Sequence, residues 1–246
     1  MKLYAYCLAE DLDTLDISSP GISGAPVRLL KIDDLAVLVS DTEIEAVPVT
    51  RDNALAHAAV VRSVLDQTTP LPFRFGSLVT EEQLRSYIST RKPALEKKLT
   101  HVRACVEMSV KIIWQLTDDS TNPSQNPSQK IRAVELQGAG ATFLAEKRRE
   151  ILGDERGAAE AGEITAWLSE AVSGLARDEQ VTVRSAERLM LSAAHLVERV
   201  QLQHYRERIG EARENRPELH FLTSGPWPPY SFANIELEFK TQFGVS

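Results

Sequence analysis

The clearest pattern in the chain is a strict alternation of apolar and polar side chains over residues 106–116, VEMSVKIIWQL. Every even-numbered position is apolar, whereas Glu107, Ser109 and Lys111 lie between them. Successive side chains of a β-strand point to opposite faces of a sheet. The segment therefore predicts a strand with one face on a core and the other face at least partly hydrated.

The residues that precede this strand predict a smaller set of strands. Apolar runs at 2–9, 27–32 and 35–40 have the composition of β-strands. The last two flank Asp33 and Asp34, which favour a turn, so we expect a hairpin there.

Two helices are predicted in the same part of the chain. Apolar positions at helical spacing predict one helix that is capped by Asp52 or Asn53 and ends near residue 67. The second begins at Thr80, with glutamates in its first turn where the helix dipole favours acids. We expect it to break near Pro93 and to end near residue 100.

The residues after the alternating strand predict a longer series. A polar stretch at 117–130 contains two Asn-Pro steps and no apolar residue, which indicates a flexible loop. The elements expected after it are a broken helix at about 139–177, strands near 180–185 and 188–197, a helix that carries Leu202, Tyr205, Ile209 and Ala212 on one face and stops at Pro217, and a strand at 218–223.

Counted from residue 106, the order of these elements is β-α-β-β-α-β, which is the ferredoxin-like arrangement. The alternating strand then belongs with the C-terminal half. The predicted fold class is α+β with two domains: an N-terminal α+β domain at 1–102, and a modified ferredoxin-like domain at 103–246 that contains the flexible 117–130 loop.

Composition and charge narrow the function classes. The formal net charge of −7 at pH 7 argues against non-specific nucleic-acid binding, which requires a basic face. No apolar run approaches the roughly 20 residues of a membrane-spanning helix, and no signal peptide is evident. The only cysteines, Cys7 and Cys105, lie in apolar runs, so we expect buried thiols, no disulfide and a reducing, cytoplasmic location.

The sequence offers little catalytic or metal-binding chemistry. The five histidines form no recognised metal spacing, and His57 fits a hydrogen-bonded histidine at the edge of the core. The glycines at 137–143, QGAGATF, lack the spacing and the lysine of a phosphate-binding loop. No GxSxG motif is present. We therefore predict no catalytic, cofactor-binding or metal-binding residues and no enzymatic activity.

Two segments stand out from this background. In LPFRFGS, 71–77, alternation predicts that Leu71, Phe73 and Phe75 share one face and Arg74 the other. The guanidinium either forms an ion pair within the protein or anchors the carboxylate of a partner.

The second segment is TSGPWPPYSF, 223–232, in which three prolines exclude both a helix and a central strand. It is either a ligand-like loop or a structural plug. We expect a plug in the C-terminal domain, with at most Trp227 or Tyr230 partly exposed to a partner, so that Trp227→Ala mainly reduces stability.

Several segments together resemble the gas vesicle protein F/L family. They are LPFRFGS (71–77), VEMSVKI (106–112), GATFLAEKRRE (140–150) and LTSGPWPPYSF (222–232). A further segment, AAHLVER (193–199), has His195 where the family usually has tyrosine.

The resemblance implies a two-domain α+β protein with a modified ferredoxin-like second domain. It further implies an accessory or minor structural protein of gas vesicle assembly, without cofactors, associated with the vesicle. The implied partners are the hydrophobic shell protein and other accessory proteins, and Arg74, Trp227 and Tyr230 are the candidate contacts. The alternative is a ferredoxin-like domain that senses a small ligand.

Overall fold

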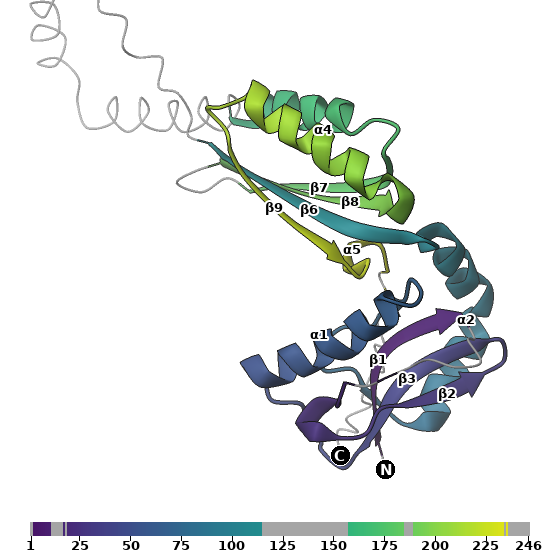
Figure 1. Cartoon of the computed structure of the whole chain (residues 1–246). Helices are drawn as coiled ribbons and strands as arrows, with labels where there is room; N and C mark the ends of the chain where they lie inside the picture. Colours follow the sequence, from purple (N-terminus) through teal and green to yellow (C-terminus); the bar gives the residue numbers. More distant parts are fainter. Residues whose placement is uncertain are drawn as a thin grey trace, which may run out of the picture.

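The computed structural model describes residues 2–10, 17, 19–114, 157–184, 189–233 and 235. Within them the fold is mixed α/β, with two antiparallel sheets that each carry helices (Figure 1). The loop expected at 117–130 and the glycine-rich 137–143 lie outside the described residues.

The first sheet is built from residues near the N-terminus. Its strands are β1 (Lys2–Glu10), β2 (Arg28–Ile32), β3 (Leu35–Thr42), β4 (Leu71–Pro72) and β5 (Leu78–Val79). The order is β2-β3-β1-β4, and β5 also pairs with β1. A short 3-10 helix, η1 (Ile22–Gly24), precedes the predicted hairpin of β2 and β3, which is confirmed.

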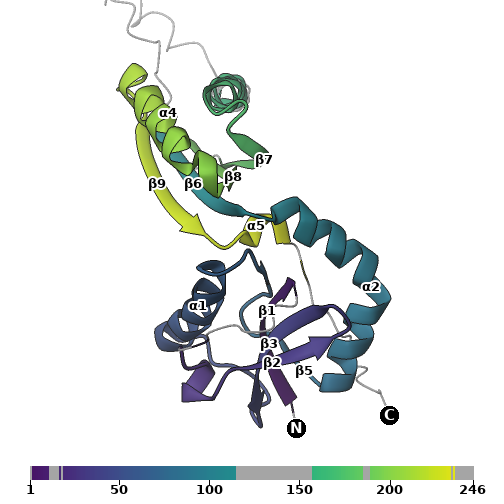
Figure 2. The ribbon, with the colours of Figure 1, turned by 45° about the vertical axis from the view of Figure 1, so that its right-hand side comes forward.

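The central strand β1 is buried on both faces. Leu3 and Ala5 join the core that includes α2 (Glu81–Val102), while Tyr4 joins the core on the side of α1 (Arg51–Leu65). The register against β3 shifts between Ala5 and Cys7, so Cys7 lies with Tyr4 instead of with Ala5. Such a bulge re-aims side chains without ending the strand. Figure 2 shows the two helices on opposite sides of this sheet.

The helix starts differ in detail from the sequence expectation. The predicted cap of α1 at Asp52 or Asn53 is wrong: Thr50 has the extended backbone of a cap, and its side chain accepts a hydrogen bond from the Asn53 amide at 3.2 Å. Thr80 caps α2 as expected, in a reciprocal capping box with Gln83.

The predicted break of α2 near Pro93 is also wrong. The helix continues to Val102 with Pro93 inside it. Proline removes one backbone donor, but Leu95 and Leu99 beyond it are buried in the core of the first sheet. Burial of these two side chains stabilises the helical conformation beyond Pro93.

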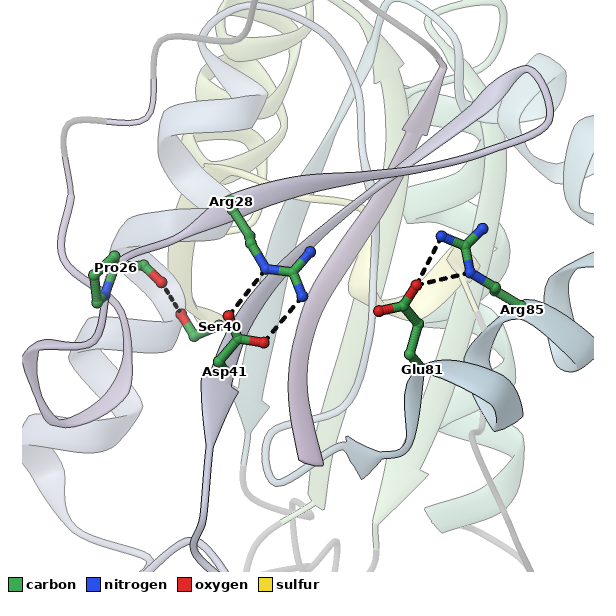
Figure 3. Close-up of polar contacts among 6 residues, drawn as sticks. All are labelled: Pro26, Arg28, Ser40, Asp41, Glu81 and Arg85. Carbon is green, nitrogen blue, oxygen red and sulfur yellow. Dashed lines mark hydrogen bonds and ion pairs between the residues drawn. The ribbon is translucent and has the colours of Figure 1, made fainter. Parts of the chain in front are cut away.

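Polar contacts join β2 and the residues before it to β3, and a further ion pair lies in the first turns of α2 (Figure 3). Arg28 on β2 donates two hydrogen bonds to the Asp41 carboxylate on β3, at 3.1 and 2.9 Å, which lowers the pKa of that carboxyl group. The Ser40 hydroxyl donates to the Pro26 carbonyl at 2.8 Å. Arg85 pairs with Glu81 one turn before it at 2.8 Å. The two ion pairs are exposed, so each contributes little to stability.

The second sheet has four strands: β6 (Cys105–Trp114), β7 (Ala176–Arg184), β8 (Leu189–Glu198) and β9 (His220–Trp227). Their order is β7-β8-β6-β9, so the alternating segment forms a central strand. Helical residues 157–171 and α4 (Leu202–Asn215), which follows the 3-10 helix η3 (Arg199–Gln201), cover one face. In Figures 1 and 2 both helices lie on the same side of the sheet.

The proline-rich segment adopts two structures in succession. Thr223 to Trp227 extend β9 as an edge strand, which agrees with the exclusion of a central strand. The exclusion of helix is wrong, because α5 (Tyr230–Ala233) follows directly. Pro228 and Pro229 precede its first turn, where a missing backbone donor costs little.

A single core cluster joins the two sheets. Phe232, Ala233 and Ile235 are buried with Leu71 and Phe73 of the first half. The plug expected from the sequence is therefore present at Phe232. It does not simply close the C-terminal half, however, because its contacts lie in the core that includes β1 and α2.

Candidate partner-binding site

A groove of roughly 360 Å³ lies where the two sheets meet. Pro72 and Arg74 line it from the first half, Gln180 lines it from β7, and Tyr230 and Phe232 line it from α5. Two of the three candidate contact residues, Arg74 and Tyr230, thus share one site, although they are far apart in the sequence.

Arg74 stands at a turn where the extended segment ends. The Ser77 hydroxyl donates to the Arg74 carbonyl at 2.7 Å, and Gly76 has a positive φ of 89°. This turn ends the alternation, so the prediction that Phe73 and Phe75 share a face is wrong. Phe73 lies in the core between the sheets, and Phe75 packs in the core on the α1 side. The Arg74 side chain itself is exposed.

Trp227 and Tyr230 are both half-exposed, at 47% and 41%. We expected at most Trp227 or Tyr230 to be partly exposed, and both are, because β9 is an edge strand and α5 buries only its Phe232 and Ala233. The Trp227 indole nitrogen donates to the Ser224 hydroxyl at 3.2 Å. Partial burial of the Tyr230 hydroxyl raises its pKa well above the usual range.

The α5 segment is fixed by a buried carboxylate. Glu107 on β6 accepts hydrogen bonds from the Ser231 amide at 2.8 Å and from the Ser231 hydroxyl at 2.9 Å. Burial raises the pKa of Glu107, and the two bonds from Ser231 oppose that rise. Gln180 on β7 donates to the Ser231 carbonyl at 2.8 Å. A central strand and an edge strand thus both hold the short helix.

Further bonds reach the same segment from the first half. Lys98 on α2 donates to the Ala233 carbonyl at 2.7 Å, and Arg62 on α1 donates to the Pro226 carbonyl at 2.7 Å. Gly225 has a φ of 124°, and a Cβ there would lie 2.8 Å from the Glu107 carbonyl oxygen. Only glycine fits this approach of β9 to β6.

The sequence did not reveal Glu107, Gln180 and Ser231 as site residues. Glu107 carried a usable signal, since an acid near the start of a central strand requires a partner if it is covered. Ser231 and Gln180 carried none, because their roles depend on where α5 docks. Trp227 does not line the groove, but it lies only three residues before Tyr230.

A second, polar groove of roughly 260 Å³ adjoins the first on the open face of the second sheet. Lys111, Thr182, Arg184 and Ser192 line it, and Gln180 is common to both grooves. The hydrated face expected for the alternating strand is thus confirmed at Lys111, which is exposed, but not at Glu107, which α5 covers.

Two buried histidines lie away from these grooves. His57 and His195 each place Nδ1 within hydrogen-bond distance of a tyrosine hydroxyl, Tyr4 at 2.8 Å and Tyr205 at 2.6 Å. Burial lowers the pKa of each to about 4. Neutral rings in these cores agree with the structural role expected for His57. His195 fills a position where the resembling family usually carries tyrosine.

The expected environment of the cysteines is confirmed, because Cys7 and Cys105 are both free and buried. Among the residues that the structure describes, no group of three or more His, Cys, Asp or Glu side chains is arranged to hold a metal ion.

Comparison with known protein families finds one that matches almost the whole chain. The gas vesicle synthesis protein GvpL/GvpF family matches residues 2–234. The chain belongs to this family. The match covers both sheets, the junction groove and α5, so every candidate contact residue lies inside the GvpL/GvpF region.

Individual GvpL/GvpF relatives agree with this membership. Gas vesicle protein L2 of Halobacterium salinarum is 27% identical over 260 residues, which cover 94% of this chain and 90% of the relative. Gas vesicle protein L of a Streptomyces species is 27% identical over 256 residues, covering 96% and 94%. These relatives are named as gas vesicle proteins, and none of the comparisons supports the alternative of a small-ligand sensor.

Solved GvpF structures share the fold. The crystal structure of GvpF from Microcystis aeruginosa aligns with a TM-score of 0.74 at 19% identity, covering 95% of this chain and 99% of that one. GvpF from Anabaena aligns equally well, with a TM-score of 0.74. None of the helices described in this GvpL/GvpF chain is long and apolar enough to cross a membrane.

Proposed function

We propose that this protein is a non-enzymatic accessory or minor structural protein of gas vesicle assembly. It acts by binding the hydrophobic shell protein and other accessory proteins, in the cytoplasm and at the vesicle. Membership of the GvpL/GvpF family across residues 2–234 supports the assembly role. The proposed contact residues are Arg74, Trp227 and Tyr230.

The observation that carries the contact proposal is the exposure of two aromatic rings at a rigid junction. Trp227 and Tyr230 are 47% and 41% exposed, yet Glu107, Gln180 and Arg62 hold the backbone around them. Aromatic residues dominate the energetics of many protein interfaces. A fixed backbone lowers the entropy cost of ordering such rings on binding. An apolar shell subunit therefore finds a preformed surface there.

We also propose a division into two domains, 1–102 and 103–246, with a modified ferredoxin-like fold in the second. The element order β6, helical 157–171, β7, β8, α4 and β9 supports this division. The sheet order β7-β8-β6-β9 supports it as well, because the first and third strands of the unit lie at the centre. The shared core at Phe232 then acts as the contact between the domains.

A capture experiment tests the partner contacts. The purified shell protein is immobilised, and retention of the wild-type chain is compared with that of W227S/Y230S and Arg74→Glu. The matched control is V49S/V200S, which removes two apolar side chains of 90% and 84% exposure elsewhere on the surface. We expect retention to fall in the first two variants and to persist in the control.

Two results would contradict the proposal. One is equal retention of W227S/Y230S and the wild type, which would remove the aromatic contact. The other is a deletion strain with vesicles of normal number and shape, which would remove the assembly role. Thermal unfolding of each variant shows whether a lost contact reflects lost folding.

A further inference from the structure

We propose that the groove which α4 forms with β6 and β9 receives the side chains of an extended acidic peptide segment of a partner protein, whose backbone adds to the second sheet as a fifth strand beside β9. The groove is lined by other residues than the junction groove. The proposal therefore goes beyond the proposed function and does not depend on Arg74, Trp227 or Tyr230.

The outer edge of β9 is open. Among the described strands β9 pairs only with β6, so its other edge has no partner strand. Alternate residues of an edge strand direct their backbone N–H and C=O groups outward, where they can pair with an added chain. Leu222, Thr223 and Ser224 are exposed along this edge, Leu222 at 59%.

The opposite edge of the same sheet shows the contrast. The strand β7 carries four charged residues in nine, Arg177, Asp178, Glu179 and Arg184. Charged side chains on an edge strand are a common protection against unwanted strand pairing. From Phe221 to Trp227, β9 carries no charged residue. The edge is thus protected by charge at β7, whereas Phe221 to Ser224 of β9, which precede Pro226, carry neither a charge nor a proline.

A groove of roughly 250 Å³ lies beside this edge. It is lined by Met108 to Val110 of β6, by Tyr205 and Ile209 of α4, and by Thr223 to Gly225 of β9. Gly210 lines it from α4, and a Cβ built there would have no atom within 4 Å. The helix therefore leaves space for a side chain of the added strand. Figures 1 and 2 both show α4 running alongside β9.

Two arginines give the groove its chemical preference. Arg206 and Arg213 line it from the same face of α4. Within the described part of the chain, neither side chain has an ion pair or a hydrogen bond. Other arginines of this region do have partners: Arg208 lies 3.8 Å from Glu211, and Arg216 pairs with Glu218. Two guanidinium groups without a carboxylate partner favour an acidic ligand.

The spacing defines the ligand further. Arg206 and Arg213 are two helical turns apart, about 10.5 Å along the axis. In an extended peptide, residues i and i+4 lie on one face about 13 Å apart. Long arginine side chains bridge this difference. The fitting motif is acidic-x-apolar-x-acidic, with the central apolar side chain over Gly210.

Fluorescence anisotropy with a labelled peptide tests the proposal on the full chain. The probe is acetyl-Thr-Glu-Thr-Leu-Thr-Glu-Thr-amide, and the control peptide has both glutamates replaced by lysine. We expect binding of the acidic peptide that weakens between about 0.05 M and about 0.5 M salt, and no binding of the lysine peptide. Amide hydrogen exchange of residues 221–225 should slow only with the acidic peptide.

Matched variants locate the site. R206E/R213E should weaken peptide binding roughly tenfold or more, because both charge-assisted bonds are lost. Arg208→Glu reverses a charge outside the groove of the same helix and should change binding less than about twofold. Gly210→Phe fills the groove without touching either charge and should also abolish binding.

Several outcomes would overturn the proposal. They are no binding of the acidic peptide up to about 1 mM, unchanged binding by R206E/R213E, and equal binding of the lysine peptide. A concentration-dependent dimer that protects residues 221–225 and resists the peptide would assign the edge to a second copy of the chain. R206E/R213E retains the junction residues, so shell-protein capture and peptide binding can fail independently.

Discussion

The two sheets of this protein differ in how much of their surface is covered. The first has helices on both faces, and β1 is buried from Leu3 to Ala9. The second has helices on one face, and β7 contains no fully buried residue. The first sheet thus contributes chiefly burial, and hence stability. Among the residues that the structure describes, the second leaves one face largely uncovered, one edge of β9 unpaired and two grooves, which are the surfaces that we propose for partners.

The placement of polar groups follows the same division. In the first sheet, the Tyr6 hydroxyl is buried and satisfied by the Ser40 hydroxyl at 3.0 Å and the Ile22 amide at 2.8 Å. In the second, Lys111, Thr182 and Arg184 line an open groove. Interior polar groups specify one packing arrangement, whereas surface groups remain available to partners.

The largest expected effect comes from separating the two sheets at their shared core. Phe232→Ala removes a ring that is 7% exposed within the cluster joining both halves. Loss of a buried phenylalanine costs about 3–5 kcal/mol. Urea denaturation followed by far-ultraviolet circular dichroism measures the change in the free energy of unfolding.

The matched control is Trp227→Ala, five residues earlier. Because Trp227 is 47% exposed, we expect a loss below about 1 kcal/mol. A loss for Trp227→Ala as large as that for Phe232→Ala would contradict this contrast. It would confirm instead the sequence-based prediction that Trp227→Ala mainly reduces stability.

The next effect concerns pH and compares the two buried histidines. Burial lowers the pKa of His57 in the first half and of His195 in the second to about 4. In the unfolded chain each histidine is protonated near pH 6.5, whereas in the native protein each ring is protonated only near pH 4. Stability is therefore fully present above pH 6.5 and falls between pH 6.5 and 4, by about 3 kcal/mol for each ring.

Glutamine variants separate the two contributions. His57→Gln and His195→Gln should each reduce the loss of unfolding free energy measured between pH 6.5 and 4, and the double variant should reduce it further. Glu179 lies 3.6 Å from His195 and opposes the fall in its pKa, so Glu179→Gln should steepen the loss. An unchanged pH profile in His57→Gln would show that this ring does not titrate differently in the two states.

The smallest effects come from a pair of glycines with opposite surroundings. A Cβ at Gly21, beside the first sheet, would lie 2.1 Å from the Tyr6 hydroxyl and 2.6 Å from that of Ser40. Gly21→Ala should therefore destabilise by about 1–3 kcal/mol. Gly210 in α4 has open space, so Gly210→Ala should stabilise by about 0.5–1 kcal/mol. Thermal unfolding measures both, and shifts of the same sign would contradict the contrast.

Elements with strong periodicity could be predicted from the sequence. The alternation at 106–116 gave a central strand, and Tyr205, Ile209 and Ala212 are the buried face of α4. The spacing of apolar residues fixes such faces locally. The cap at Thr50 and the continuous helix through Pro93 were missed because backbone geometry and tertiary packing decide them.

The candidate site was less accessible to sequence reasoning. Arg74 and Tyr230 stood out as unusual residues, but only the docking of α5 brings them to one groove. The exposure of Trp227 depends on β9 lying at an edge. Arg206 and Arg213 have no ion pair with any described residue, which depends on the neighbours that the fold provides. In the sequence they belong to an ordinary charged helix.

The docking of α5 against the first half has a consequence during synthesis on the ribosome. More than a hundred residues separate Val102, the end of α2, from Phe232, which completes the shared core. At about 5–20 residues per second, synthesis of the intervening residues takes roughly ten seconds, and the Phe232 ring is absent from the first half during that time. Leu71 and Phe73 are not yet covered by Phe232 during this interval. Chaperones or partner proteins can therefore reach an apolar surface that is buried in the finished protein.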